Sequence, residues 1–448
     1  MKFFIQTIPT TSSTISIPFT ELDKLSLRGK QAITIRIGVI QKKAVLSHHN
    51  DHDRCIYISS DLVKDMSLPE FIEYEIKIQD DILFIGPILG MLVRGKIAEM
   101  NLPRIKIYKN YLIDYQHVNG LIVLFTSDGI NYKKKLINGY AYNPINKEWV
   151  EGIFPFPSAV FLRKSIKESS RKKLQKLIGN NFFNSHVFNK WEMWEWFSKS
   201  EQLKQNLPET VLAENMEEVK KLMDVYQKTF IKPRAGMQGT GIFQLSMVGK
   251  EYTLSYRVKD KNIKTILDNW EAVQLYLQSE LNLQNYIVQQ KIPLLRNNNR
   301  VMDNRVIVVK DQNGAWSVSG MVTKFGDIDS IVSNISSGGS AEKGWQALVE
   351  MYQGDSKQAF KKYMEIEKLA LTCCKVLESK GLHLGYIGID IGIDENHHLW
   401  VIEINNRNPD MTIALDANDF QLYYKTKSAP FHYAKWLACF GGEKRDAL

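Results

Sequence analysis

The segment from Gly388 to Asn405 constrains the fold most, because apolar and polar residues alternate along it on both sides of a short polar stretch. If the stretch Asp394–His398 is the turn of a hairpin, Asp390 lies directly opposite Glu403. In this register one face of the hairpin is a continuous apolar surface. The residues expected on that face are Ile389, Ile391, Ile393, Trp400, Ile402 and Ile404.

The other face of this hairpin is polar and carries Asp390, Glu403 and Asn405. Two opposed carboxylates about 5 Å apart repel each other unless a cation or a proton lies between them. Carboxylate and amide oxygens suit Mg²⁺ that is held together with substrate phosphates. The alternative is an acidic hairpin face on which both carboxylates are merely solvated.

A second motif runs from Phe230 to Ile242, where a short apolar strand delivers Lys232 and is followed by Gly236, Gly239 and Gly241. Glycines at this spacing allow backbone N–H groups to turn toward an anion such as a nucleotide phosphate. The motif is not a P-loop, because no Gly-Lys-Ser/Thr ending follows, and its glycine spacing differs from that of dinucleotide-binding turns. An ordinary hairpin loop is the alternative.

A third motif is the strand Met302–Val309, which carries Asp303 and Arg305 on one face. A guanidinium matches phosphate oxygens, and a carboxylate can accept hydrogen bonds from ribose hydroxyls. Taken alone, the pair is also compatible with a surface salt bridge.

The hydrophobic pattern divides the chain into three parts. Alternating residues such as Ile33, Ile35 and Ile37 predict a small β-rich module over residues 1–80. Apolar runs bounded by turn signals predict an α/β unit over residues 81–180, and alternating strands and helices predict a larger α+β or α/β domain over residues 181–448. The His- and Asp-rich segment 47–55 has no metal-ligand spacing and is interpreted as a polar loop.

Composition narrows the partners of the protein. The excess of 58 Lys and Arg over 49 Asp and Glu is spread over 448 residues in short clusters, so a nucleic-acid partner is not expected. The longest apolar stretch, Ile82–Val93, is too short and too interrupted to span a membrane, and the N-terminus has no signal-peptide core. The four cysteines lack metal-ligand spacing, so we expect reduced thiols and a cytoplasmic location.

In order and spacing, these motifs resemble the ATP-grasp superfamily of carboxylate–amine ligases. The whole chain most resembles its YheC/YheD family of spore-forming bacteria, which is described as endospore coat-associated. The ATP-grasp likeness covers residues 181–448, and phrases such as FIGPILGML and WVEGIFPFPSAVFLR extend the likeness upstream. The resemblance implies an ATP-grasp fold, in which two α+β subdomains grip ATP, behind a β-rich module and an α/β pre-ATP-grasp unit.

The resemblance also implies nucleotide contacts. Lys190 and Lys232 are similar to the two nucleotide-binding lysines, and the Gly-rich segment to the flap that closes over the β- and γ-phosphates. Tyr286–Gln290 resembles the hinge whose backbone binds adenine, although two glutamines stand where a glutamate is common. The expected nucleotide-binding residues are Lys190, Lys232, Gly236, Gln238, Gly239, Thr240, Gly241, Gln289, Gln290, Lys291, Ile292 and Asp303.

The same resemblance assigns the metal and the reacting phosphate. Asp390, Glu403 and Asn405 match the ligands of Mg²⁺, for which Mn²⁺ is an alternative. Asp303 matches a ribose ligand and Arg305 the ligand of the transferring phosphate, as in ribosomal-protein glutamate ligases. The segment 332–339 resembles the loop that follows that arginine. The expected catalytic residues are Arg305, Lys232 and Asn334.

The implied activity is that of an ATP-dependent ligase. A carboxylate would attack the γ-phosphorus of ATP to give an acyl phosphate and ADP, and an amine would displace phosphate to form an amide. Small-molecule or peptide carboxylates and amines are the expected substrates. The segment Asn405–Asp410 lacks the Pro-Gly pair frequent in other ATP-grasp ligases, which indicates variation at the acceptor side. The alternatives are an ATP-grasp kinase and an ATP-binding structural protein that associates with spore-coat proteins without turnover.

Overall fold

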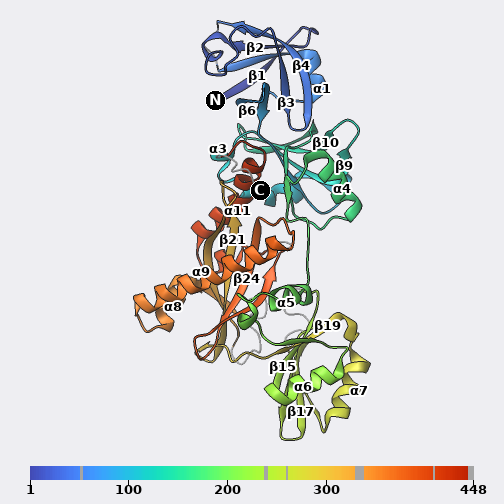
Figure 1. Ribbon diagram of the computed structural model, residues 1–448, viewed down its shortest axis with the longest axis vertical. Helices are drawn as coiled ribbons and strands as arrows, with labels where there is room; N and C mark the ends of the chain where they lie inside the picture. Colours follow the sequence, from blue (N-terminus) through green and yellow to red (C-terminus); the bar gives the residue numbers. More distant parts are fainter. Residues whose placement is uncertain (51–53, 237–240, 259–260, 328–337, 407–408, 442–448) are drawn as a thin grey trace.

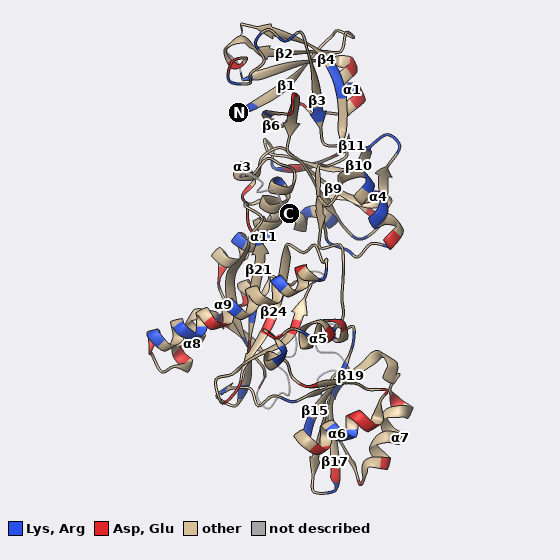
Figure 2. Ribbon diagram, viewed as in Figure 1, with Lys and Arg blue, Asp and Glu red and all other residues tan. Residues whose placement is uncertain are grey.

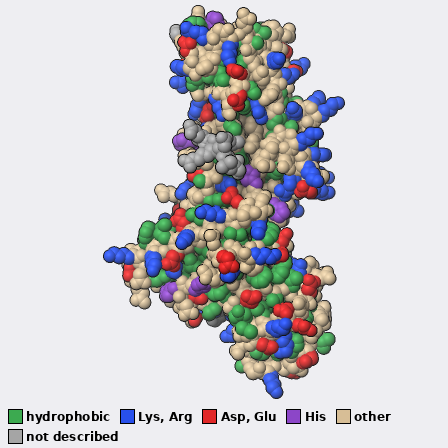
Figure 3. Space-filling model, in the orientation of Figure 1, with side chains coloured by type: hydrophobic (Ala, Val, Ile, Leu, Met, Phe, Trp, Pro, Cys, Tyr) green, Lys and Arg blue, Asp and Glu red, His purple; other side chains and the backbone are tan. Residues whose placement is uncertain are grey.

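The computed structural model describes residues 1–50, 54–236, 241–258, 261–327, 338–406 and 409–441. Four β-sheets are arranged along the long axis of an elongated molecule (Figure 1). Lys and Arg are interspersed with Asp and Glu over the whole length of the chain (Figure 2), and the face shown in Figure 3 carries both signs of charge on every part. In the described residues, no helix is long and apolar enough to cross a bilayer.

The first sheet is a closed barrel with the strand order β1-β5-β2-β4-β3-β7-β6. Its strands are β1 (Lys2–Ile8), β2 (Thr14–Pro18), β3 (Ala32–Ile37), β4 (Ile40–His49), β5 (Cys55–Ser59), β6 (Glu73–Gln79) and β7 (Ile82–Gly86), with the short helices η1 (Phe19–Glu21) and α1 (Ser60–Met66). As the alternation predicts, Ile33, Ile35 and Ile37 are buried inside the barrel. Because β7 belongs to the barrel, the first sheet extends past residue 80, where the sequence places the first boundary.

The second sheet has the order β11-β10-β9-β8-β12-β13 and combines four parallel strands with an antiparallel hairpin. Its strands are β8 (Ile88–Leu92), β9 (Leu121–Asn131), β10 (Leu136–Asn143), β11 (Glu148–Pro155), β12 (Ala159–Leu162) and β13 (Phe182–Phe183). Its helices are η2 (Ile97–Glu99), α2 (Leu102–Ile105), η3 (Lys106–Leu112), α3 (Tyr115–Val118) and α4 (Glu168–Ile178). The C-terminal helix α11 (Phe420–Leu437) returns to this sheet, and Tyr433 packs edge-on against Phe183 with 4.8 Å between ring centroids.

The third sheet is antiparallel, with the order β14-β19-β15-β16-β17-β18. Its strands are β14 (Thr210–Leu212), β15 (Lys228–Pro233), β16 (Phe243–Val248), β17 (Glu251–Val258), β18 (Lys261–Leu267) and β19 (Tyr286–Gln290). The apolar residues of helices α6 (Met216–Tyr226) and α7 (Trp270–Glu280) form one core with those of the sheet. The short helices η4 (Lys204–Asn206) and η5 (Leu283–Asn285) lie in the connections.

The fourth sheet has the order β23-β22-β21-β24-β25, and β20 pairs with β21 at its side. Its strands are β20 (Arg296–Asn297), β21 (Arg300–Lys310), β22 (Trp316–Phe325), β23 (Ser340–Lys343), β24 (Tyr386–Ile393) and β25 (Leu399–Asn405). Its helices are α5 (Lys190–Ser198), α8 (Gly344–Met351), α9 (Ser356–Ser379) and α10 (Ile413–Asp416). Helices α5 and α9 share a buried core with β24 and β25, so both third and fourth sheets are covered by helices.

The β24–β25 hairpin confirms the predicted pairing of Asp390 with Glu403 but corrects the expected apolar face. The register shifts by one residue after Asp390, so that Ile391 pairs with Val401 and Ile402 is the extra residue of a β-bulge. Because a one-residue shift exchanges the two faces, Val401 is buried in the core and Ile402 is only half-buried. Trp400 is also outside the buried core, and its indole donates to Asp394 Oδ2 at 2.9 Å.

Candidate functional site

Four charged side chains of the fourth sheet form a buried ion-pair network. Arg305 on β21 lies opposite Asp390 on β24, and its Nε and Nη2 donate to the two carboxylate oxygens, the second at 3.1 Å. Lys324 on β22 lies opposite Asp303, and its Nζ is 2.9 Å from Asp303 Oδ1 and 3.1 Å from Asp390 Oδ2. All four residues are at least nine-tenths buried, so neither a solvated acidic face nor a surface salt bridge describes them.

The network keeps the Asp390 carboxylate charged. Burial alone would raise the pKa of Asp390, but Arg305 and Lys324 outweigh it and hold that pKa well below its ordinary value. Burial likewise would lower the pKa of Lys324, but Asp303 and Asp390 outweigh it and raise that pKa. The repulsion expected between opposed carboxylates is therefore relieved by cations of the protein itself.

Lys232 reaches the same region from the third sheet. Lys232 lies near the C-terminal end of β15 and is 8% exposed. Its Nζ donates to Gln289 Oε1 at 2.7 Å. Gln289 in turn donates from Nε2 to Thr210 Oγ1 at 3.0 Å. Burial and the nearby Lys190 lower the pKa of Lys232 to about 8, although Glu403 and Asp303 oppose this change. An anion bound beside Lys232 would stabilise its protonated form.

Lys190 lies between the third and fourth sheets. It is the first residue of α5, whose start is fixed by a capping box between Asn189 and Glu192. Lys190 Nζ is 3.1 Å from Glu403 Oε1 on β25 and 3.5 Å from the carbonyl oxygen of Gly236. The helix start thus places this lysine between the acidic hairpin and the beginning of the Gly-rich segment.

The expected phosphate flap lies only partly within the described residues. Gly236 and Gly241 border the segment, and Gly241 adopts a left-handed backbone conformation with φ +74°. Gln238, Gly239 and Thr240 lie outside the described residues, and so does Asn334, the third expected catalytic residue.

The expected adenine hinge is strand β19 and the residues that follow it. The backbone N–H of Gln290 donates to the Glu209 carbonyl at 2.8 Å, and that of Lys291 donates to the Lys228 carbonyl at 3.1 Å. Lys291 Nζ donates to Gln244 Oε1 at 2.6 Å, and burial lowers the pKa of this lysine to about 8. Since both N–H groups bond within the protein, neither is available to donate to adenine here.

The acidic face of the hairpin has the donor chemistry of a Mg²⁺ site. Asp390 and Glu403 are paired across the two strands, and Asn405 Nδ2 lies 3.5 Å from Asp390 Oδ2. In the described part of the chain, no three or more carboxylate, histidine or cysteine side chains are grouped to hold a metal. Mg²⁺ bound with phosphates needs only one or two carboxylates, so the donor set fits a metal that arrives with a nucleotide. Binding would require Asp390 to exchange part of its contact with Arg305 and Lys324.

Lys324 is the charged residue of this network that sequence patterns did not reveal. It lies in the apolar run Met321–Phe325 at the end of β22, and it is 6% exposed. A lysine inside an apolar strand is rarely buried without an acidic partner, which is the signal that would have singled it out.

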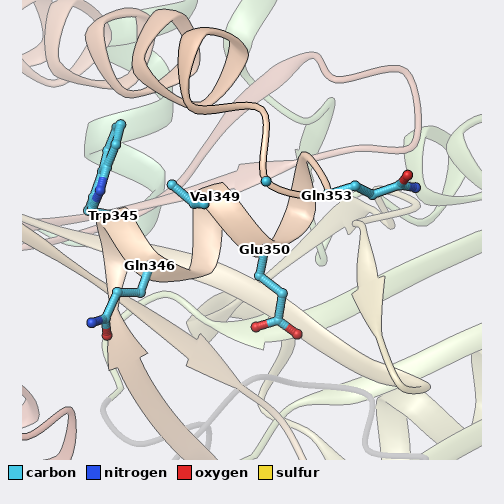
Figure 4. Close-up of a pocket in the computed structure, with 6 residues that line it drawn as sticks. Trp345, Gln346, Val349, Glu350 and Gln353 are labelled. Atoms are coloured by element: carbon cyan, nitrogen blue, oxygen red, sulfur yellow. The ribbon is translucent and has the colours of Figure 1, made fainter.

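Two surface hollows lie away from the charged network. One, of about 450 Å³, is on α8 (Figure 4), and the other, of about 540 Å³, is bordered by Asp114, Ser319 and His432. None of the site residues expected from the sequence lines either of these two hollows. The first is lined by Trp345, Gln346, Val349, Glu350, Gln353 and Gly354.

Comparison with known sequences gives one family and two curated relatives. The sequence model of the family described as YheC/D like ATP-grasp matches residues 179–437. The endospore coat-associated protein YheD of Bacillus subtilis (strain 168) is 26% identical over 452 residues, which cover 98% of this chain and 96% of that protein. The endospore coat-associated protein YheC of the same strain is 21% identical over 294 residues, which cover 64% of this chain and 80% of that protein.

Two of the similar solved structures are an ATP-grasp ligase and a D-Ala:D-Ser ligase. A RiPP-associated ATP-grasp ligase of Chryseobacterium gregarium, in complex with ADP and a leader and core peptide, is 13% identical. The match covers 80% of this chain and 99% of that chain, with a TM-score of 0.39. The VanG D-Ala:D-Ser ligase of Enterococcus faecalis is 12% identical, and the match covers 79% of this chain and 99% of that chain with a TM-score of 0.43.

Proposed function

The chain belongs to the YheC/D-like ATP-grasp family, and from this premise we propose that it is an ATP-dependent ligase that joins a carboxylate to an amine. The family match confirms both the family and the ATP-grasp fold expected from the sequence. The division into three domains with boundaries near residues 80 and 180 remains a prediction, as does the cytoplasmic location.

The observation that carries the proposal is the excess of positive charge where the third and fourth sheets meet. Four cations surround three carboxylates there, and each carboxylate lies within 3.1 Å of a cation. In such a site the cations can pair with phosphate oxygens while Mg²⁺ neutralises the carboxylates that they release, so that buried charges stay paired. The cations are Lys190, Lys232, Arg305 and Lys324, and the carboxylates are Asp303, Asp390 and Glu403.

In phosphoryl transfer the residues of this site would have different roles. Lys190 and Lys232 would bind the phosphates, and Arg305 would stabilise the charge that develops on the transferred group. Asp390, Glu403 and Asn405 would hold Mg²⁺, which supplies charge compensation for the phosphates when it is bound. Burial of the network excludes water, which strengthens these interactions and protects a reactive intermediate from hydrolysis.

The reaction needs no nucleophile from the protein. An oxygen of the substrate carboxylate forms a bond to the γ-phosphorus while the bond to ADP breaks, which gives an acyl phosphate. The amine then forms the C–N bond, the C–O bond to phosphate breaks, and the amine proton passes to solvent. In this mechanism the lysines and Arg305 align the reactants and stabilise the developing charge.

Nucleotide binding is tested by thermal unfolding with and without Mg-ATP. Mg-ATP should raise the Tm of the wild type, and Lys232→Ala and Glu403→Ala should each remove most of that rise. Lys199→Ala is the matched control, because Lys199 follows α5 but pairs only with Glu195 of its own helix in the described structure. An unchanged rise in both site variants would overturn the site assignment.

The reaction is tested by incubation with Mg-ATP and mixed amino acids or cell extract, followed by measurement of ADP and mass spectrometry of products. ADP together with a new amide supports the ligase, and a phosphorylated product without an amide supports a kinase. The two Bacillus subtilis relatives are named endospore coat-associated proteins, and this favours one further candidate, an ATP-binding coat component without turnover. The absence of ADP under all conditions supports that candidate.

A further inference from the structure

The short segment Phe188–Lys190 connects the third sheet to the fourth. The backbone N–H of Lys190 donates at 3.0 Å to the carbonyl oxygen of Arg234, which directly follows β15 of the third sheet. Two residues earlier, Phe188 is hydrogen-bonded to Asn406, which directly follows β25 of the fourth sheet. This segment is therefore attached to both sheets between which we expect the phosphates to bind.

The side-chain amide of Asn406 makes both hydrogen bonds to Phe188. Its Nδ2 donates to the Phe188 carbonyl oxygen at 3.0 Å, and its Oδ1 accepts from the Phe188 N–H at 3.4 Å. Asn406 is 4% exposed and Phe188 is 5% exposed, so these polar groups depend on each other for their hydrogen bonds. A side-chain amide matches both backbone groups of one residue, because it carries a donor and an acceptor side by side. The contact thus fixes orientation as well as distance.

Expected site residues lie close to this contact on both segments. Asn406 directly follows Asn405, the last residue of β25, and Glu403 lies two residues further back on the strand. Phe188 precedes Lys190 by two residues, and Lys190 Nζ is 3.1 Å from Glu403 Oε1. The amide contact and the ion pair therefore join the same two segments of the chain.

The pair of Lys190 and Glu403 depends on where the backbone places the two residues. The Lys190 side chain is 13% exposed and that of Glu403 is 31% exposed, so solvent screens this pair in part. In the described structure, Lys190 Nζ also donates a long hydrogen bond of 3.5 Å to the Gly236 carbonyl oxygen. Holding a flexible lysine in one geometry costs conformational entropy, and this cost falls when the backbone around it is already fixed.

We propose that Asn406 is a positioning residue for phosphate binding, because its amide holds the backbone before Lys190 against the end of the metal-binding strand β25. This inference rests on the proposed ligase function and deepens it. Asn406 acts through Lys190 and not by contact with the nucleotide, since its amide is occupied by Phe188. A lysine on a backbone fixed in this way loses less freedom when it pairs with a phosphate oxygen.

The first test is isothermal titration calorimetry of Mg-ATP with the full-length wild type, Asn406→Ala, Lys190→Met and the double variant. Each protein is titrated at a temperature where circular dichroism shows it to be folded. Asn206→Ala is the matched control, because the Asn206 amide ties η4 to the other end of β25, where its Nδ2 donates to the Leu399 carbonyl oxygen at 2.8 Å.

Asn406→Ala and Lys190→Met should each weaken Mg-ATP binding about tenfold, as expected for loss of a charged hydrogen bond. The double variant should bind within about threefold of Lys190→Met, because Asn406 acts through Lys190. Asn206→Ala should bind like the wild type. Equal binding by Asn406→Ala and the wild type, or a second tenfold loss in the double variant, would overturn the inference.

The second test needs no nucleotide. Urea unfolding of the wild type, Lys190→Met, Glu403→Gln and their double variant measures the coupling between the two side chains. This coupling should disappear when Asn406→Ala is added to all four proteins, and it should persist when Asn206→Ala is added. A wild type that does not bind Mg-ATP would overturn the proposed ligase and with it the role in phosphate binding. A coupling that is absent from the wild type, or unchanged by Asn406→Ala, would overturn only the positioning by Asn406.

Discussion

Replacement of Asp390 by Asn removes the negative charge that joins Arg305 to Lys324 in the fourth sheet. Removal of one partner of a buried ion pair costs about 3–5 kcal/mol, because an uncompensated charge stays buried. Lys324 keeps Asp303 at 2.9 Å, whereas Arg305 loses the carboxylate with which it pairs in the described structure. We therefore expect a loss at the low end of that range, about 3 kcal/mol in the free energy of unfolding.

The loss is measured by urea unfolding, followed by tryptophan fluorescence and circular dichroism. Asp390→Asn combined with Arg305→Met removes both partners and leaves the Lys324–Asp303 pair intact, so the double variant should lose less than the sum of the two single losses. Asp355→Asn is the charge-matched control, because Asp355 caps α9 and Asn caps a helix equally well. A loss below about 1 kcal/mol, or strict additivity, would refute the buried network as described.

The pH dependence of this loss follows from the lowered pKa of Asp390. A carboxyl whose pKa is lower in the folded state adds stability above its unfolded pKa, and this stability is lost only as the pH falls through the folded value. The difference between wild type and Asp390→Asn should therefore stay constant from about pH 5 to pH 8. A difference that vanishes within this window would contradict the assignment.

Three further outcomes follow from other contacts. The pKa of Lys232 is lowered to about 8, so calorimetry of Mg-ATP binding near that pH in buffers of different ionisation enthalpy should reveal proton uptake. Lys232→Met should abolish this uptake, and Lys199→Met, outside the site, should retain it. Asn184 donates from Nδ2 to the Tyr386 carbonyl at 2.7 Å and accepts from the Gly385 N–H at 2.9 Å, so Asn184→Ala should cost about 2–4 kcal/mol in urea unfolding, and a smaller loss would contradict it. Gly314 has φ +75°, and a Cβ there would lie 2.6 Å from the Trp436 ring, so Gly314→Ala should lower the Tm; an unchanged Tm would count against this contact.

Local sequence patterns determined the parts of the fold that depend on neighbours in the chain. Period-two alternation predicted the buried faces of the barrel strands and the Asp390–Glu403 pair, because side chains alternate across a strand whatever it packs against. The motif order around Lys232, Arg305 and Asp390 indicated the ATP-grasp fold. What alternation could not locate was the bulge at Ile402, because one extra residue leaves the local pattern apolar while it exchanges the faces.

The tertiary structure alone decided which charges meet. Lys324 joins Asp303 and Asp390 because β22, β21 and β24 are neighbours in one sheet, and Lys190 reaches Glu403 because α5 starts beside β25. Strand order and helix placement depend on packing between segments far apart in sequence, and the return of α11 to the second sheet is of the same kind. The sequence by itself therefore indicated the candidate site residues other than Lys324, and the packing of distant elements determined their partners and burial.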